Sequence, residues 1–316
     1  MDWAKIILDS PTPEVAWQEL FSCLHKLSTE HCPSPVALHD ATVIPDRLLS
    51  EAAWELWEAF PASALHASAC LKDWTKSASG KAVLILDALS LRELPFLLGG
   101  AQARGIQPLE IKITGAESPS TTDQFARALG LSSRSALAND GKPGAFSLFG
   151  GNCYTDAISI PFDDCAVPPK PNIVIWHSWL DDLVHLQHKL PDQITNIAST
   201  VLQGDGFWGF INKLRQGRSL VITSDHGYAV SKRFSSEVED PEAIEILRQT
   251  FGASRYKPEA EPMTKRFMPP IVMSHNGQNM VVGQRKWKVQ GGFPHVCHGG
   301  MSLLEVAVPW IELEAV

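Results

Sequence analysis

Four apolar runs, separated by stretches with helical patterning, constrain the fold of this chain most strongly. They read AVLILDA, IQPLEIKIT, NIVIWHS and SLVITSD and cover residues 82–88, 106–114, 172–178 and 219–225. Apolar runs of this kind, alternating with helices, are typical of strands in a parallel sheet that is covered on both faces. The sequence therefore predicts an α/β fold with a mostly parallel central sheet and helices on both faces.

The first eighty residues show helical spacing instead. Thr12 followed by Pro13 is a favourable helix start, because proline fits the first helical position. Apolar residues then recur at helical intervals, and the sequence predicts helices over about 12–27, 46–60 and 63–78. We therefore expect a small helical N-terminal region over residues 1–78 and a larger domain with the sheet over residues 79–316.

About residues 228–294 break the alternation of strands and helices, and we interpret them as an insertion near the site. Asn276-Gly277 predicts a two-residue hairpin within it. Arg255 also lies there, and a position in a solvent-exposed loop is favoured over a contact with a ligand. Beyond the insertion, Ser302 and Glu305 predict a capping box, and Pro309 favours an edge position for the last strand.

Composition excludes several classes of protein. The net charge of −8 argues against a generally basic nucleic-acid surface, although a local patch or metal ions could still hold a nucleic acid. Six cysteines without any CxxC pair indicate reduced thiols rather than a zinc finger. Without a twenty-residue apolar stretch or a leader, the chain is expected to be cytoplasmic and to have no membrane partner.

Acidic residues and histidines stand where the predicted strands end. Asp87 ends the first run, and Asp225 and His226 follow the fourth. One aspartate at such a position is more often a helix cap or loop residue. Ligands of parallel sheets, however, bind at the carboxyl ends of the strands, so the joint occurrence favours a shared site.

Two further segments carry the same chemistry. Asp181 and His185 are four residues apart, which places both side chains on one face of a helix, with Asp182 as an alternative to Asp181. His298 lies in the C-terminal loop, with His295 as its alternative. Carboxylates and imidazoles without thiolates suit a catalytic zinc or manganese site better than a calcium or magnesium site.

Five segments resemble the alkaline phosphatase superfamily in sequence and in order: LILDALSLRELP, SPSTTDQFARAL, LDDLVH, ITSDHG and HGGMSLLEVAVP. They are most similar to its PglZ-domain branch, which occurs in phage-defence (BREX-like) proteins and in proteins associated with response regulators. The resemblance covers about residues 81–316 and leaves the N-terminal helices unmatched.

The resemblance implies two divalent metal ions, usually zinc, with manganese as the alternative, on either side of a nucleophile. A proline three residues before the nucleophile in related phosphodiesterases makes Pro119 point to Thr122, with Thr121 and Ser120 as alternatives. One metal set would comprise Asp87, Thr122, Asp225 and His226. The other would comprise Asp181, His185 and His298.

The expected function is a two-metal phosphoesterase that forms a phospho-enzyme on Thr122. Thr122 is predicted to begin a helix, where free N–H groups favour phosphate, and coordination would lower the pKa of its hydroxyl. Phosphodiesters such as nucleotides or oligonucleotides are favoured over monoesters, because no arginine stands directly beside Thr122. Arg127 and Arg134 are the candidates for such a role.

Two alternatives remain open at this level. The chain could be a non-catalytic, metal-binding component of a defence complex, with a protein partner on its tryptophan-containing N-terminal helices. It could also be a phosphomutase or a sulfatase-like enzyme on the same fold. A sulfatase would need cysteine or serine at the nucleophile, and the segment between residues 123 and 171 is short for the second domain of a phosphomutase.

Overall fold

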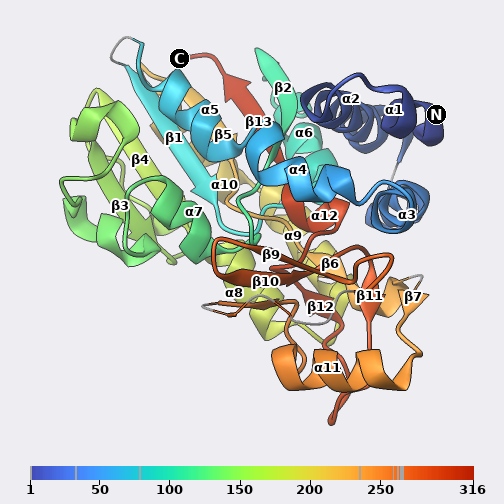
Figure 1. The fold of residues 1–316 in the computed structure, drawn as a ribbon. Helices are drawn as coiled ribbons and strands as arrows, with labels where there is room; N and C mark the ends of the chain where they lie inside the picture. Colours follow the sequence, from blue (N-terminus) through green and yellow to red (C-terminus); the bar gives the residue numbers. More distant parts are fainter. Residues whose placement is uncertain are drawn as a thin grey trace.

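A computed structural model describes residues 2–32, 34–77, 80–234, 236–258, 260–261, 263 and 267–316. Its centre is a six-stranded sheet in the order β2-β13-β5-β1-β4-β3 (Figure 1). β13 runs antiparallel to β2 and β5, whereas β1, β3, β4 and β5 are parallel. The predicted α/β fold with a mostly parallel sheet is therefore confirmed. The strands are β1 (Lys81–Leu86), β2 (Glu110–Gly115), β3 (Tyr154–Ile158), β4 (Asn172–His177), β5 (Ser219–Thr223) and β13 (Ala307–Leu313).

Helices cover both faces of this sheet because its central strands are apolar on both sides. In β1, Leu84 and Leu86 join one hydrophobic cluster, whereas Val83 and Ile85 join the other. The first cluster includes residues of α6 (Leu94–Gln102), α8 (Trp179–Leu186), α9 (Pro191–Gln203) and α10 (Asp205–Arg215), and the second includes residues of α5 (Ala67–Trp74) and α7 (Thr122–Ala128).

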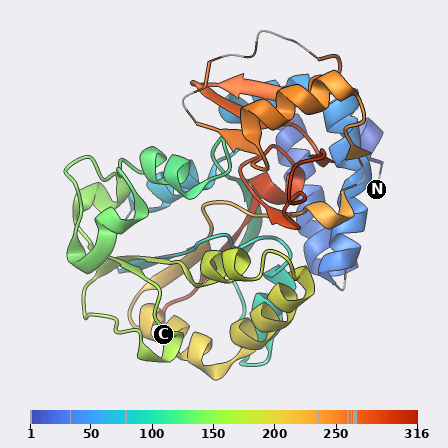
Figure 2. The ribbon, with the colours of Figure 1, turned by 90° about the horizontal axis from the view of Figure 1, so that it is seen from below.

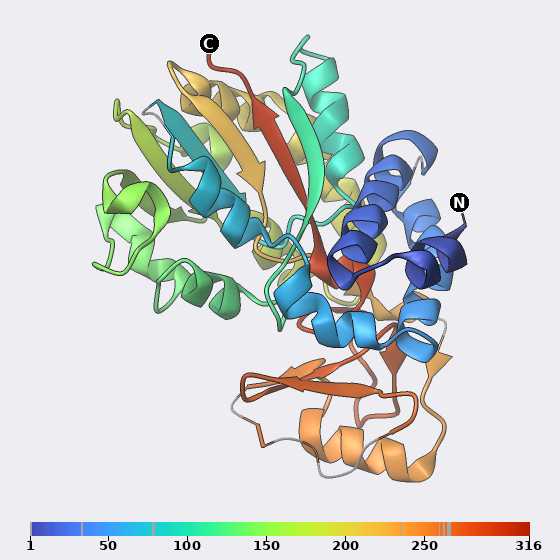
Figure 3. The ribbon, with the colours of Figure 1, turned by 45° about the horizontal axis from the view of Figure 1, so that its top comes forward.

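The N-terminal helices pack beside the sheet (Figure 3). Trp17 and Trp57 are fully buried, with ring centroids 4.9 Å apart, and both belong to the same hydrophobic cluster as the sheet. These tryptophans are therefore core residues. The predicted boundary between residues 78 and 79 lies outside the described residues. The helices are α1 (Trp3–Asp9), α2 (Pro13–Lys26), α3 (Pro35–Glu51), α4 (Glu55–Ser63) and α5, with a π-helical turn, η1 (Leu27–His31), after α2.

The single helix predicted over residues 46–60 is wrong, because α3 ends at Glu51 and α4 begins at Glu55. A tertiary contact satisfies one of the last carbonyl groups of α3. Arg285 Nη2 donates to the carbonyl of Ser50, 3.3 Å away. A helix end needs partners for its last carbonyl groups, and this partner comes from 235 residues further along the chain.

Small sheets and α11 form a separate group beside the N-terminal helices (Figure 2). The predicted hairpin at Asn276-Gly277 is confirmed, because both residues have positive φ (48° and 72°) and join antiparallel β9 and β10. This group comprises β6 (Ala229–Val230), β7 (Ser236–Glu237), α11 (Pro241–Phe251), β8 (Tyr256–Lys257), β9 (Val272–His275), β10 (Gln278–Val281), β11 (Arg285–Lys286) and β12 (Val296–Cys297).

Two expectations about the C-terminal segment are wrong. Pro309 does not lie on an edge strand, since β13 has a neighbour on each side. The ladder to β5 covers only residues 311–313, so Pro309 lies outside it, and the Pro309 carbonyl instead accepts from Thr223 Oγ1 at 2.9 Å. Ser302 stands at the N-cap of the predicted short helix, α12 (Leu303–Val306), but the capping box is not formed, because the Ser302 hydroxyl donates to the carboxylate of Glu305 instead of accepting from a backbone N–H.

None of the helices in the described ranges combines the length and apolar character that a membrane span requires.

The short 3-10 segments are η2 (Arg134–Asp140), η3 (Leu148–Gly151), η4 (Phe162–Asp164) and η5 (Ser231–Arg233).

Asp46 of α3 is buried beneath α12. Its Oδ1 accepts from the N–H of Leu303 at 2.9 Å, and its Oδ2 accepts from Gln284 Nε2 at 2.8 Å. Burial raises the pKa of Asp46 to about 7. The folded chain therefore holds a proton on this carboxyl more tightly than the unfolded chain, in which the pKa is about 3.9.

This shift predicts how stability depends on pH. The raised folded-state pKa stabilises the protein at low pH, and this contribution is lost as the pH rises from about 4 to about 7. Urea unfolding at pH 5, 6, 7 and 8 should therefore show that Asp46→Asn gains stability relative to the wild type as the pH rises. A difference between the two proteins that stays constant over this range would contradict the prediction.

Candidate active site

The site lies at the carboxyl edge of the central sheet. Asp87 follows β1, and Asp225 and His226 follow β5, its neighbour in the sheet. All three side chains are fully buried, and a ligand atom of each lies within 4.8 Å of the others. Parallel neighbouring strands therefore bring together residues that are about 140 positions apart in the chain.

The half-buried Thr122 is the first residue of α7 and faces this group. Its Oγ1 lies 3.2 Å from Asp87 Oδ1 and 3.3 Å from His226 Nε2. The two alternatives have other roles in the structure: the Thr121 hydroxyl caps α7, and the Ser120 hydroxyl donates to the carbonyl of Gly300 at 3.0 Å. The geometry therefore fits Thr122 as the nucleophile better than its neighbours.

A second group comprises Asp181, His226 and His298, whose ligand atoms also lie within 4.8 Å of one another. The rings of His226 and His298 stack with centroids 4.4 Å apart. His185 lies at the edge of this group, with Nε2 3.3 Å from Asp181 Oδ1 and a side chain that is 64% exposed. His226 is common to both groups, whereas the sequence motifs assign it to one set only.

The two alternative ligands have partners elsewhere. Asp182 Oδ2 accepts from Ser178 Oγ at 2.7 Å, at the start of α8. His295 Nδ1 lies 2.9 Å from the carbonyl of Lys189. These contacts favour Asp181 and His298 as the candidate ligands.

Backbone groups hold the candidate ligands in place. Ala88 has a φ of 63°, which is strained for a residue with a Cβ, and its N–H donates to Asp225 Oδ1 at 3.0 Å. His226 Nδ1 lies 3.0 Å from the carbonyl of Gly227. A proton on Nδ1 would serve that contact and leave Nε2 free as a ligand atom.

The electrostatics favour a bound cation. Burial raises the pKa of Asp87 well above its usual range, and the neighbouring Asp225 adds to the shift. Burial likewise raises the pKa of Asp225 to about 6, whereas burial and the nearby His226 lower the pKa of His298 to about 3. A neutral imidazole is the form that binds a metal, and a cation would relieve the crowded carboxylates.

Two oxygens provide a direct test of whether a metal fits. Asp225 Oδ2 is buried and accepts no hydrogen bond from the residues that the structure describes, whereas the buried Asp181 Oδ1 has only the ion pair with His185 Nε2, 3.3 Å away. Buried carboxylate oxygens without a partner are costly, and a cation would satisfy them. Asp225 Oδ2 belongs to the first group and Asp181 Oδ1 to the second. With His226 counted in the first group and His185 beside the second, the donor set fits one divalent ion in each.

The structure also brings Arg134 of η2 to the site, where its guanidinium forms an ion pair with Asp87 Oδ2. Its side chain is 30% exposed and can therefore meet a ligand from solvent. Arg127 of α7 is exposed. The spacing of the sequence does not favour one arginine over the other. The 3-10 segment η2 brings Arg134 to the site, and the sequence did not predict that segment.

No protein-family profile and no curated protein matches this chain. Its structure is similar to that of murine ectonucleotide pyrophosphatase/phosphodiesterase 5, with 12% identity and a TM-score of 0.44 over 74% of this chain and 88% of that one. An inactive form of the murine protein in complex with AMP gives 13% identity and a TM-score of 0.44 over 75% and 88%.

Phosphonoacetate hydrolase from Sinorhizobium meliloti 1021, in complex with phosphonoacetate, gives 10% identity and a TM-score of 0.37 over 75% of this chain and 90% of that one. At such scores, these similarities assign neither an activity nor residue roles to this chain. The functional proposal therefore depends on the chain's own residues.

Asp181 and Asp182 form a matched pair for testing the ligand assignment. Asp181→Asn should lower the affinity for zinc by more than about 100-fold, since even outer contacts of metal ligands contribute 10–100-fold. Asp182→Asn should bind zinc as the wild type does, because that carboxylate is bonded to Ser178. Competition with a chromophoric chelator measures the zinc affinity of both variants. Equal losses of affinity in the two would contradict the assignment of Asp181 as the ligand.

Proposed function

We propose that this chain is a metal-dependent phosphohydrolase of the alkaline phosphatase type, with Thr122 as its nucleophile. The observation that carries the proposal is the position of the Thr122 hydroxyl, within 3.3 Å of both Asp87 and His226. Two divalent ions, zinc or manganese, would be held by Asp87, Asp225 and His226 with Thr122, and by Asp181, His185 and His298.

Such ions supply charge neutralisation and lower the pKa of a coordinated hydroxyl. The residues of the chain do the rest. Thr122 Oγ1 loses its proton and attacks phosphorus, the bond to the leaving oxygen breaks, that oxygen takes up a proton, and a phosphothreonine ester forms. The oxygen of a water molecule then attacks phosphorus, the bond to Thr122 Oγ1 breaks, and one proton of the water returns to Thr122. A monoester substrate thus yields phosphate, and a diester substrate yields a phosphomonoester. The negative charge of the buried carboxylates opposes deprotonation of the Thr122 hydroxyl, so bound cations would be needed to favour the alkoxide.

The PglZ branch is a finer proposal that the sequence motifs support. It implies a role in phage defence or in response-regulator signalling, with the N-terminal helices as the surface for a protein partner. A nucleotide or oligonucleotide is the substrate class that this branch of the proposal favours.

Arg134 supports a second candidate substrate class. The preference for phosphodiesters rested on the absence of an arginine beside Thr122, and Arg134 contacts Asp87 in the same group. A guanidinium can donate two N–H bonds to non-bridging phosphate oxygens, and a monoester dianion gains more from this than a diester monoanion. We therefore propose phosphomonoesters as the alternative substrates.

Activity assays of Thr122 variants distinguish this function from a non-catalytic assembly role. Thr122→Ala removes the nucleophile, whereas Thr122→Ser keeps a hydroxyl at the same place. With zinc or manganese added, turnover of bis-p-nitrophenyl phosphate or p-nitrophenyl phosphate should fall at least about 1000-fold in Thr122→Ala and be retained in part by Thr122→Ser. Absence of turnover in a wild-type protein that holds metal would favour the assembly role.

Arg134→Ala should separate the two substrate classes. If Arg134 contacts the transferred phosphoryl group, kcat/KM for p-nitrophenyl phosphate should fall about 10- to 100-fold, the range of a charge-assisted hydrogen bond. The value for bis-p-nitrophenyl phosphate should fall less, and Arg127→Ala should change neither, because Arg127 is exposed on α7. Equal losses on both substrates would contradict a role in discrimination.

A further inference from the structure

We propose that Arg255 and Glu305 are positioning residues, whose buried ion pair fixes the loop that presents His298 and so makes the 228–294 segment an integral part of the site. The part of this inference that concerns metal affinity rests on the proposed function. The part that concerns the loop does not, since it follows from contacts within the chain.

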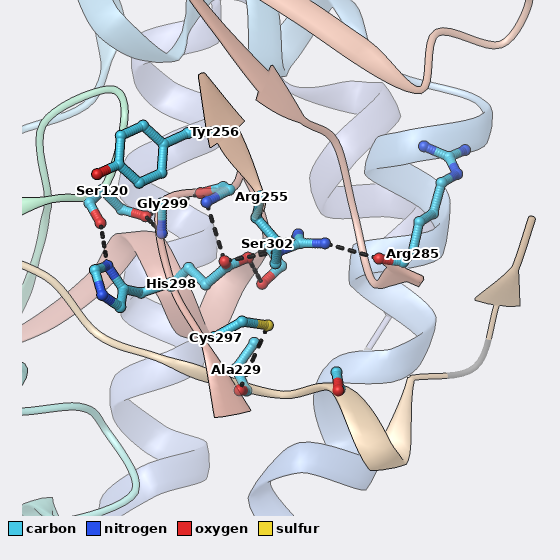
Figure 4. Close-up of polar contacts among 12 residues, drawn as sticks. Ser120, Ala229, Arg255, Tyr256, Arg285, Cys297, His298, Gly299 and Ser302 are labelled. Carbon is cyan, nitrogen blue, oxygen red and sulfur yellow. Dashed lines mark hydrogen bonds and ion pairs between the residues drawn. The ribbon is translucent and has the colours of Figure 1, made fainter. Parts of the chain in front are cut away.

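Arg255 is fully buried, so the expectation that it lies in a solvent-exposed loop is wrong. Its Nε and Nη2 each lie 2.8 Å from one carboxylate oxygen of Glu305, which gives a two-pronged ion pair. Nη1 and Nη2 also donate to the carbonyls of Arg285 and Gly283, both at 2.8 Å. The guanidinium therefore ties the segment after α11 to the segment after β10 and to α12 (Figure 4).

Glu305 also forms hydrogen bonds with the two loops that carry His298 and His226. Its Oε1 accepts from the N–H of Gly300 at 3.0 Å, and its Oε2 accepts from Ser302 Oγ at 2.6 Å. Its backbone carbonyl accepts from the N–H of Gly227 at 2.9 Å, next to His226. One residue therefore holds the His298 loop through its side chain and the His226 loop through its backbone.

The same loop is bonded to the segment before the nucleophile. Ser120 Oγ accepts from the N–H of Gly299 at 3.1 Å and donates to the carbonyl of Gly300 at 3.0 Å. His298 Nδ1 lies 3.4 Å from the carbonyl of Ser120 (Figure 4). The His298 loop is thus held between Glu305 on one side and Ser120, two residues before Thr122, on the other.

Close packing explains why two glycines follow His298. Gly299 has a φ of 93°, and a Cβ there would collide with the ring of Tyr256. A Cβ on Gly300 would lie 2.6 Å from both Arg255 Nε and Nη2. The loop backbone therefore lies directly against the guanidinium and leaves no room between them, so movement of Arg255 would move His298.

The accessibility of Cys297 reports on this loop in metal-free protein. Cys297 precedes His298 and is 8% exposed. Its labelling by a disulfide reagent, assigned by peptide mass mapping, should be slow in the wild type. In Glu305→Gln, which loses the charge and one acceptor of the pair, we expect labelling at least 10-fold faster.

Metal affinity provides the second readout. Glu305→Gln should bind zinc 10- to 100-fold more weakly in chelator competition, with an altered visible spectrum of the cobalt form, as expected when an outer contact of a ligand is lost. Trp287→Phe is the matched control, because Trp287 is buried in the same segment and bonds Gly252 rather than the loop. It should leave both labelling and spectrum unchanged.

The double variant Arg255→Leu/Glu305→Leu separates positioning from general stability. Replacing both members of a buried ion pair by apolar residues can preserve stability, whereas removal of one leaves a buried charge. The double variant leaves no buried charge, but the carbonyls of Gly283 and Arg285 and the N–H of Gly300 lose a partner, so we expect it to fold and to unfold below the wild-type temperature. At temperatures well below that transition it should still show fast Cys297 labelling. Restored protection of Cys297 would overturn the proposal, as would equal labelling in Trp287→Phe. A wild type that protects Cys297 but binds no zinc would instead overturn the proposed function.

Discussion

The crowding of two buried carboxylates, Asp87 and Asp225, is the constraint on which this structure depends. Adjacent parallel strands place them at the same edge of the sheet, where burial disfavours the charge of both and the charge of Asp225 further opposes the ionisation of Asp87. Arg134 balances Asp87 in part. Asp225 Oδ2 has no donor among the described residues, and this deficit is what a divalent cation would relieve.

The rest of the site is arranged around that deficit. His226 Nε2 lies 3.7 Å from Asp87 Oδ1 and 3.5 Å from Asp225 Oδ2, and the His226 ring stacks on the ring of His298. The hydroxyl of Thr122 meets the same group at the start of α7. The C-terminal loop then brings His298 back to the site from the opposite end of the chain, fixed by Glu305 and Ser120.

Sequence reasoning succeeds where local pattern and topology suffice. Apolar runs that end in Asp87, and in Asp225 with His226, identify strand ends, and parallel strands carry such residues to one edge without further information. The helical spacing of Asp181 and His185 likewise places their side chains together. By contrast, the contact of Arg134 and the pairing of Arg255 with Glu305 join segments 47 and 50 residues apart, and no local pattern encodes them.

Anomalous X-ray diffraction at the zinc absorption edge would show whether this edge of the sheet holds two metal ions. Crystals grown with zinc should give two peaks about 4 Å apart. One should lie among Asp87, Asp225 and His226, and the other beside Asp181 and His298. Full-occupancy peaks elsewhere, with none at these side chains, would contradict the account.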